Sequence, residues 1–126
     1  MKVLYIDDDR INTLLFEETA RFVPGLELET ASTAAEALEL APRFGPELLV
    51  IDLHLPDGDG FSLLPRLRAA IGRPELPAVL CSADDTPEIA ERATAAGFSG
   101  RWPKPVEIPV VIAELKRLGG PASGVA

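Results

Sequence analysis

The chain has 126 residues, 47% of them hydrophobic and 25% charged, so it is long enough to bury a core as one domain without disulfides. Its 12 basic and 20 acidic side chains give a formal net charge of -8, which argues against direct binding to nucleic acid or to an anionic membrane surface. No apolar run has the length of a membrane span, and the single cysteine, Cys81, lacks a disulfide partner. We therefore expect a soluble cytoplasmic protein.

The first half of the chain alternates short strands with amphipathic helices. Residues 3–6 predict a strand that leads into three acids, and the helix after it ends at Pro24-Gly25, with apolar positions at Ile11, Leu14, Leu15 and Phe22. Residues 26–30 alternate apolar and acidic side chains, as in a half-exposed strand at a sheet edge. A second helix begins at Ser32 or Thr33 with Glu36 as a capping-box partner, and it ends before Pro42.

A continuously apolar strand at residues 48–51 follows and ends abruptly at Asp52. Residues 56–60 form a Pro/Gly/Asp loop, and a third helix starts near Asp59. The inward positions predicted for this helix are Phe61, Leu64, Leu67 and Ile71.

The last third of the chain repeats the pattern twice. Residues 78–81 predict a buried strand that ends at Ser82, and Thr86-Pro87-Glu88 begins a helix that runs to about residue 96. Residues 98–102 form a short strand, Lys104 lies in a turn between two prolines, and residues 106–118 form the last helix. The core positions predicted for that helix are Val110, Val111, Ala113 and Leu118.

Five strand-then-helix units predict an α/β fold, a doubly wound five-stranded parallel sheet with helices on both faces. The expected strand order is 2-1-3-4-5, as in flavodoxin-like folds. Residues 1–118 would form the domain, and residues 119–126, rich in Gly, Pro and Ser, a flexible tail.

The predicted topology brings polar side chains from four strand ends to one edge of the sheet. Asp7 and Asp8 follow the first strand, Asp52 the third, Ser82 the fourth and Lys104 the fifth. Crowded carboxylates oppose each other's ionisation unless a cation lies among them, and Mg²⁺ prefers such oxygen ligands. A lysine and a hydroxyl facing a metal-bound carboxylate would receive the oxygens of a phosphoryl group, with Asp52 as nucleophile.

These motifs resemble the signature of response-regulator receiver domains of two-component signalling. The resemblance rests on Asp7-Asp8, on Asp52 before Leu-His-Leu-Pro-Asp-Gly-Asp-Gly, on Ser82-Ala83 and on Lys104-Pro105, and it covers residues 2 to 118. It implies that Asp52 accepts a phosphoryl group from a phosphohistidine on a histidine kinase or a histidine phosphotransfer protein. Such a domain would promote only its own phosphorylation and dephosphorylation and would not be an enzyme for other substrates.

The resemblance also implies a role for each site residue. Asp8 and Asp52 would ligate Mg²⁺ directly, the backbone carbonyl of His54 would be a further ligand, and Asp7 would act through a bound water. Lys104 would pair with the phosphoryl oxygens, and Ser82 would move to hydrogen-bond them. Phosphorylation would shift the last helices and strand between two conformations and so change the surface shown to a downstream protein target. Because no output domain follows, the chain resembles a stand-alone receiver, although the tail could equally be a linker cut from a larger protein.

The sequence departs from the receiver pattern at Arg101. Receivers usually carry Tyr or Phe three residues before the lysine, and that aromatic ring moves with the switch hydroxyl. Arg101 leaves two readings open, ordinary receiver chemistry with weaker or different switching, or a specialised role in which Arg101 pairs with an acidic partner or with Asp84. Strand alternation places Trp102 on the opposite face from Arg101.

Two other functions compete with the phosphoacceptor hypothesis. An aspartyl-phosphate phosphatase commonly has a second Asp two residues after the nucleophile, and His54 stands there instead. A phosphorylation-independent interaction module would keep the fold as a scaffold. The complete set of acids, hydroxyl and lysine argues against the scaffold, and Arg101 keeps it open.

Overall fold

The computed structural model describes residues 1–84, 86–104 and 108–119. Its strands are β1 (Lys2–Ile6), β2 (Glu27–Ala31), β3 (Leu48–Asp52), β4 (His54–Leu55), β5 (Gly58–Asp59), β6 (Ala78–Ser82) and β7 (Gly100–Pro103). Its helices are α1 (Arg10–Ala20), α2 (Ala34–Phe44), α3 (Gly60–Ile71), α4 (Pro87–Ala96) and α5 (Ile108–Gly119).

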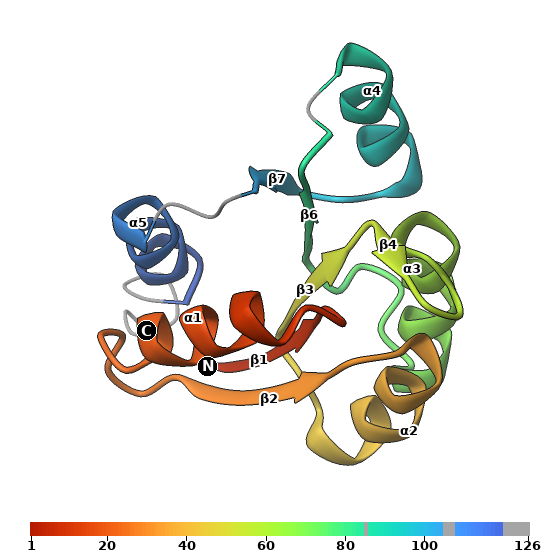
Figure 1. The fold of residues 1–126 in the computed structure, drawn as a ribbon. Helices are drawn as coiled ribbons and strands as arrows, with labels where there is room; N and C mark the ends of the chain where they lie inside the picture. The colour runs from red at the N-terminus through yellow and green to blue at the C-terminus, as the bar shows by residue number, and fades with distance from the viewer. Residues whose placement is uncertain (85, 105–107, 120–126) are drawn as a thin grey trace.

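Five strands form one parallel sheet in the order β2-β1-β3-β6-β7. Because β4 and β5 form a separate two-stranded sheet, this is the predicted 2-1-3-4-5 order, and the fold class is confirmed. In Figure 1, α1 and α5 lie on one side of the sheet, and α2, α3 and α4 on the other. The short β4–β5 hairpin was not predicted, since two-residue strands carry no periodic signal.

Each face of the sheet has its own apolar core. Tyr5, Phe16, Trp102 and Leu115 belong to the core under α1 and α5, and the larger core under α2, α3 and α4 is built mainly from Leu, Ile and Ala. All five residues of β3 and of β6 are buried, as the continuous apolar runs predicted. Among the described residues, no helix is long and apolar enough to cross a membrane.

Side-chain caps define where the helices begin. Asp9, Thr33, Asp59 and Thr86 each accept a hydrogen bond from a backbone N–H in the first turn of the helix that follows. The predicted end of the second helix at Pro42 was wrong. The helix continues through the proline to Phe44 and is capped by Gly45, whose φ of 67° is the left-handed conformation common after a helix C-terminus.

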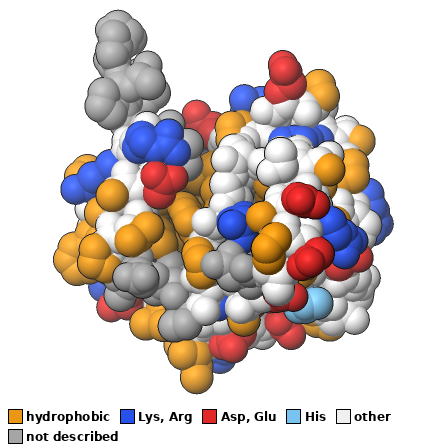
Figure 2. Space-filling model, turned by 90° about the horizontal axis from the view of Figure 1, so that it is seen from above, with side chains coloured by type: hydrophobic (Ala, Val, Ile, Leu, Met, Phe, Trp, Pro, Cys, Tyr) orange, Lys and Arg blue, Asp and Glu red, His pale blue; other side chains and the backbone are white. Residues whose placement is uncertain are grey.

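The apolar residues that predicted α1 do not face the core. Ile11 and Phe22 are 69% and 66% exposed, Leu14 and Leu15 are also exposed, and the helix buries Phe16, Thr19 and Ala20 instead. In α5, likewise, Val111 is buried, whereas Val110 and Ala113 are exposed. Figure 2 shows hydrophobic side chains gathered on the left of the molecule, the side on which α1 and α5 lie. Periodicity predicted that the helices exist, but it did not predict which of their apolar residues are exposed on the surface.

Strand boundaries shifted by one or two residues in β2 and β7. The strand predicted at 98–102 spans Gly100–Pro103, because Phe98 packs into the core beside α3 before the chain enters the sheet. Gly119, predicted as the start of the tail, is the last residue of α5. The rest of the predicted tail and the start predicted for the last helix at residue 106 lie outside the described residues.

Candidate functional site

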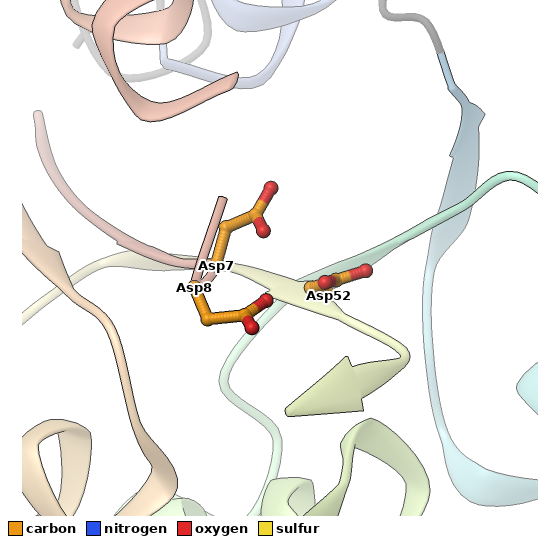
Figure 3. A group of neighbouring side chains, drawn as sticks. All are labelled: Asp7, Asp8 and Asp52. Atoms are coloured by element: carbon orange, nitrogen blue, oxygen red, sulfur yellow. The ribbon is translucent and has the colours of Figure 1, made fainter. Parts of the chain in front are cut away.

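The three predicted acids meet at the carboxyl edge of the sheet. Asp7 and Asp8 follow β1, and Asp52 is the last residue of β3, which pairs with β1 in parallel. One carboxylate oxygen from each acid lies within 4.8 Å of the others. Figure 3 shows Asp8 pointing toward Asp52 from the neighbouring strand. Asp7 and Asp52 are buried and Asp8 is exposed, so the group is open to solvent on the side of Asp8.

Lys104 joins two of these acids. Its Nζ atom lies 3.1 Å from Asp7 Oδ2 and 3.0 Å from Asp52 Oδ1. Its backbone is held by the parallel pairing of β6 and β7, and its N–H donates to the carbonyl of Ser82 over 2.9 Å. Lys104 therefore lies at the same edge of the sheet as the acids, where the predicted topology placed it, and its pairing with phosphoryl oxygens stays a prediction.

The two buried carboxyl groups have different pKa values. Burial raises the pKa of Asp52 to about 6, in spite of the hydrogen bond from Lys104, and the nearby charge of Asp7 adds to the rise. Burial alone would also raise the pKa of Asp7, but hydrogen bonds from the Asp9 N–H, Tyr5 and Lys104 outweigh it and hold that pKa below its ordinary value. The charges of Asp52 and Asp7 raise the pKa of Lys104 against the effect of its burial. Lys104 therefore stays protonated, and Asp7 stays ionised.

Ser82 and His54 occupy the loops that flank the acids. Ser82 is buried at the end of β6, and its Oγ accepts a hydrogen bond of 3.0 Å from the backbone N–H of Asp84. His54 is exposed and lies opposite Asp59 in the β4–β5 hairpin. The metal-ligand role of the His54 carbonyl and the movement of Ser82 remain predictions.

Asp9 and Tyr5 have contacts that the sequence did not predict. Asp9 caps α1 by accepting hydrogen bonds from the N–H groups of Ile11 and Asn12. Tyr5 donates a hydrogen bond of 2.8 Å to Asp7 Oδ2 from inside the sheet. Tyr5 and Asp7 are two residues apart where β1 ends, and the alternation of an extended chain puts both side chains on one face, a signal that could have revealed the pair.

The residues at this edge fit a hard divalent cation. They offer carboxylate oxygens from three acids, the ligand type that Mg²⁺ prefers. A pocket of about 340 Å³ opens beside Asp7 and Asp8 and is bounded by Thr13 and Glu36, which leaves room for the waters that Mg²⁺ retains. Among the described residues, Lys104 is the cation that balances Asp7 and Asp52 in this structure.

A sequence profile for the response regulator receiver domain matches residues 3–116. The chain belongs to the response regulator receiver domain family. The match includes every site residue discussed above, so the resemblance carried by the motifs is confirmed.

Relatives of this receiver domain include both short and long proteins. It is 34% identical over 110 residues to an uncharacterized 14.6 kDa protein in the sodA1 3′ region of Leptolyngbya boryana, covering 85% of this chain and 81% of the relative. It is 31% identical over 120 residues to the response regulator MprA of Mycobacterium leprae, covering 94% of this chain. The chain spans only 50% of MprA, so the activities of such longer proteins are not carried over.

Solved receiver structures share the whole fold. The receiver domain of the Francisella response regulator 1452 aligns with a TM-score of 0.79 and 30% identity, covering 93% of this chain and 94% of that one. The chemotaxis protein CheY4 of Vibrio cholerae aligns with a TM-score of 0.82 and 25% identity, covering 93% and 97% of the two chains.

The departure at Arg101 is visible in the structure of this receiver domain. Arg101 is exposed on β7, and Trp102 is buried on the opposite face, as strand alternation predicted. Trp102 packs near Phe16 with ring centroids 6.1 Å apart. The two readings of Arg101 stay predictions.

Gly60 holds the loop after Asp52 close to the sheet. A Cβ atom at this position would lie 2.9 Å from the carbonyl oxygen of Asp52 and 3.2 Å from a Leu80 methyl carbon. We expect Gly60→Ala to lower the free energy of unfolding by about 2 kcal/mol, because the loop or β3 must shift to relieve the clash. Urea unfolding measures this, with Gly100→Ala as the control, since a Cβ atom there meets nothing within 4 Å. Equal effects of the two substitutions would show that the close approach at Gly60 is not a constraint.

Proposed function

We propose that this receiver domain is a cytoplasmic phosphoacceptor that takes a phosphoryl group onto Asp52. The donor would be a phosphohistidine on a histidine kinase or a histidine phosphotransfer protein, and the reaction would require Mg²⁺. The domain would promote only its own phosphorylation and dephosphorylation.

The bridge that Lys104 makes between Asp7 and Asp52 carries the proposal. Its ammonium lies 3.0 Å from the carboxylate that would be phosphorylated, where it can follow the negative charge onto incoming phosphoryl oxygens. A lysine that served only as a surface charge would not be held between two buried acids.

In the reaction, an oxygen of Asp52 attacks the phosphorus atom while the bond from phosphorus to the histidine nitrogen breaks. The electron pair of that bond stays on the imidazole, and the new bond makes an acyl phosphate on Asp52. A pKa of about 6 leaves Asp52 mostly ionised at neutral pH, as a nucleophile must be. The Lys104 ammonium would turn from Asp52 to the phosphoryl oxygens. The Ser82 hydroxyl, which accepts a hydrogen bond from the Asp84 N–H in this structure, would instead donate one to the same oxygens.

The acids divide the metal ligation among them. Asp8 and Asp52 would hold Mg²⁺ directly with the His54 carbonyl, and Asp7 would hold it through a water. The bound cation would neutralise charge that builds up on the transferring group. Asp8, the exposed acid, lies on the side from which a hydrated cation enters.

The surface beside the site supports a protein partner. Ile11, Leu14 and Leu15 are exposed on α1, the helix that follows Asp7 and Asp8 directly. Exposed apolar patches on a folded domain commonly mark sites of protein interaction. Once phosphorylated, the domain would carry roughly 1.5 to 2 additional negative charges at Asp52, and a shift of α4, β7 and α5 would change the surface offered to a downstream protein.

The decisive experiment is phosphorylation by a small molecule. We expect the chain, incubated with Mg²⁺ and acetyl phosphate, to gain the mass of one phosphoryl group by intact mass spectrometry. Asp52→Asn should gain none. Asp57→Asn, an exposed acid of the same loop, should react as the parent does.

Two results would contradict the proposal. A parent chain that stays unmodified would favour the phosphorylation-independent scaffold, and equal labelling of Asp52→Asn would place the phosphoryl group elsewhere.

A further inference from the structure

Tyr5 is a buried residue whose hydroxyl faces the acid cluster. Its side chain lies inside the sheet with 1% exposure, and the hydroxyl donates to Asp7 Oδ2 over 2.8 Å. A valine or isoleucine would fill a buried strand position without bringing a polar group that needs a partner. Packing alone therefore does not explain why this buried position carries a hydroxyl group.

The tyrosine ring is held in one place. It stacks on Phe16 of α1 with centroids 4.4 Å apart and an interplanar angle of 12°. Because the ring is fixed, the hydroxyl has a fixed position relative to Asp7. At 2.8 Å from Asp7 Oδ2, the hydroxyl is placed to donate its proton in a hydrogen bond to that carboxylate.

The contacts of Asp7 explain what this donor can do. Among the described residues, Tyr5 and Lys104 both donate to Oδ2, and the Asp9 N–H donates to Oδ1 over 3.0 Å. A carboxylate has about four acceptor positions, so these donors leave one on Oδ1. The phenol and the ammonium occupy both acceptor positions of Oδ2. One acceptor position of Oδ1 is left, and a water bound to Mg²⁺ could donate to it.

We propose that Tyr5 is a positioning residue for Asp7, which keeps that carboxylate oriented for the Mg²⁺ water whether or not Lys104 contacts it. This inference rests on the proposed function, in which Lys104 leaves the acids for the phosphoryl oxygens. Tyr5 then remains as the side-chain donor to Oδ2, so the carboxylate does not turn. Outer-shell hydrogen bonds of this kind orient ligands and tune metal affinity.

Tyr5→Phe tests the proposal because it removes the hydroxyl and keeps the stacked ring. We expect isothermal titration calorimetry to show Mg²⁺ binding about 10-fold weaker than in the parent, with only a small change in Tm. Leu48→Val is the control, since Leu48 belongs to the same core but lies at the opposite end of β3 from Asp52. It should lower Tm and leave the Mg²⁺ affinity at the parent value.

The outcomes separate this proposal from the proposed function. If Tyr5→Phe binds Mg²⁺ as tightly as the parent, Tyr5 only packs and the inference is overturned, even though the parent accepts a phosphoryl group. If the parent itself binds no Mg²⁺, the metal-dependent function fails and the positioning role fails with it.

Discussion

Lys104→Met is expected to lower the free energy of unfolding of the metal-free protein by about 3 kcal/mol. The substitution keeps most of the aliphatic stem but removes the ammonium that lies between Asp7 and Asp52. Two buried carboxylates then face each other without a cation, and one of them must take up a proton or the local structure must open. Urea unfolding in the presence of a chelator measures the loss.

Mg²⁺ should raise the free energy of unfolding of Lys104→Met by more than it raises that of the parent. In the parent, the ammonium and the cation compete for the same carboxylates, and the variant removes that competition. A ligand at a hundredfold excess over its dissociation constant adds about 2.7 kcal/mol of stability, so tighter binding by the variant should be measurable.

Lys116→Met is the matched control for this experiment, because Lys116 is an exposed lysine of α5. It should change stability little with or without Mg²⁺. If Lys104→Met behaves like this control, Lys104 does not balance the acids in solution.

Asp52→Asn is expected to stabilise the metal-free protein at pH 7.5 by about 2 kcal/mol. Burial raises the pKa of Asp52 from 3.8 to about 6, which means that folding disfavours its ionised form. The folded state therefore binds more protons than the unfolded state between these values, and stability falls as the pH rises from about 4 through 6. Asparagine cannot ionise, so the variant should lack this fall.

The measurement compares urea unfolding of parent and variant at pH 5 and pH 7.5 in a chelator. Because pH 5 lies between 3.8 and about 6, the gap there should be roughly half of that at pH 7.5. The contribution of Asp7 to stability depends on pH in the opposite direction. Because its pKa is lowered in the folded state, it stabilises the fold at neutral pH, and this stability is lost only as the pH falls below the ordinary value of 3.8. A variant less stable than the parent at pH 7.5 would mean that the pairing of Asp52 with Lys104 outweighs the cost of its burial.

Both effects arise from one property of the site. Burial disfavours the ionised form of the carboxylate that would accept the phosphoryl group, and the ammonium of Lys104 reduces the free energy needed to keep it ionised. Sites that give up stability in this way are common where a group must react.

Most of the fold followed from local patterns. The apolar runs ending at Asp52 and Ser82 predicted buried parallel strands, and Thr33 and Thr86 marked helix starts that the structure confirms. These signals are local, because strand burial and helix capping depend on residues near in the chain. Pro42 misled the prediction because a proline usually ends a helix, yet α2 continues through it to Phe44.

The candidate site was also largely predictable, since the parallel sheet brings Asp7, Asp8, Asp52 and Lys104 to one edge wherever the strand order is 2-1-3-4-5. The sequence alone thus determined which residues meet. Only the tertiary structure decided how they share charge. Burial raises the pKa of Asp52, whereas hydrogen bonds from the Asp9 N–H, Tyr5 and Lys104 hold that of Asp7 below its ordinary value. The ring stack on Phe16 fixes the Tyr5 hydroxyl beside Asp7, and the packing of α1 leaves Ile11 and Leu15 exposed. Each of these depends on contacts between segments distant in the chain, which no local pattern encodes.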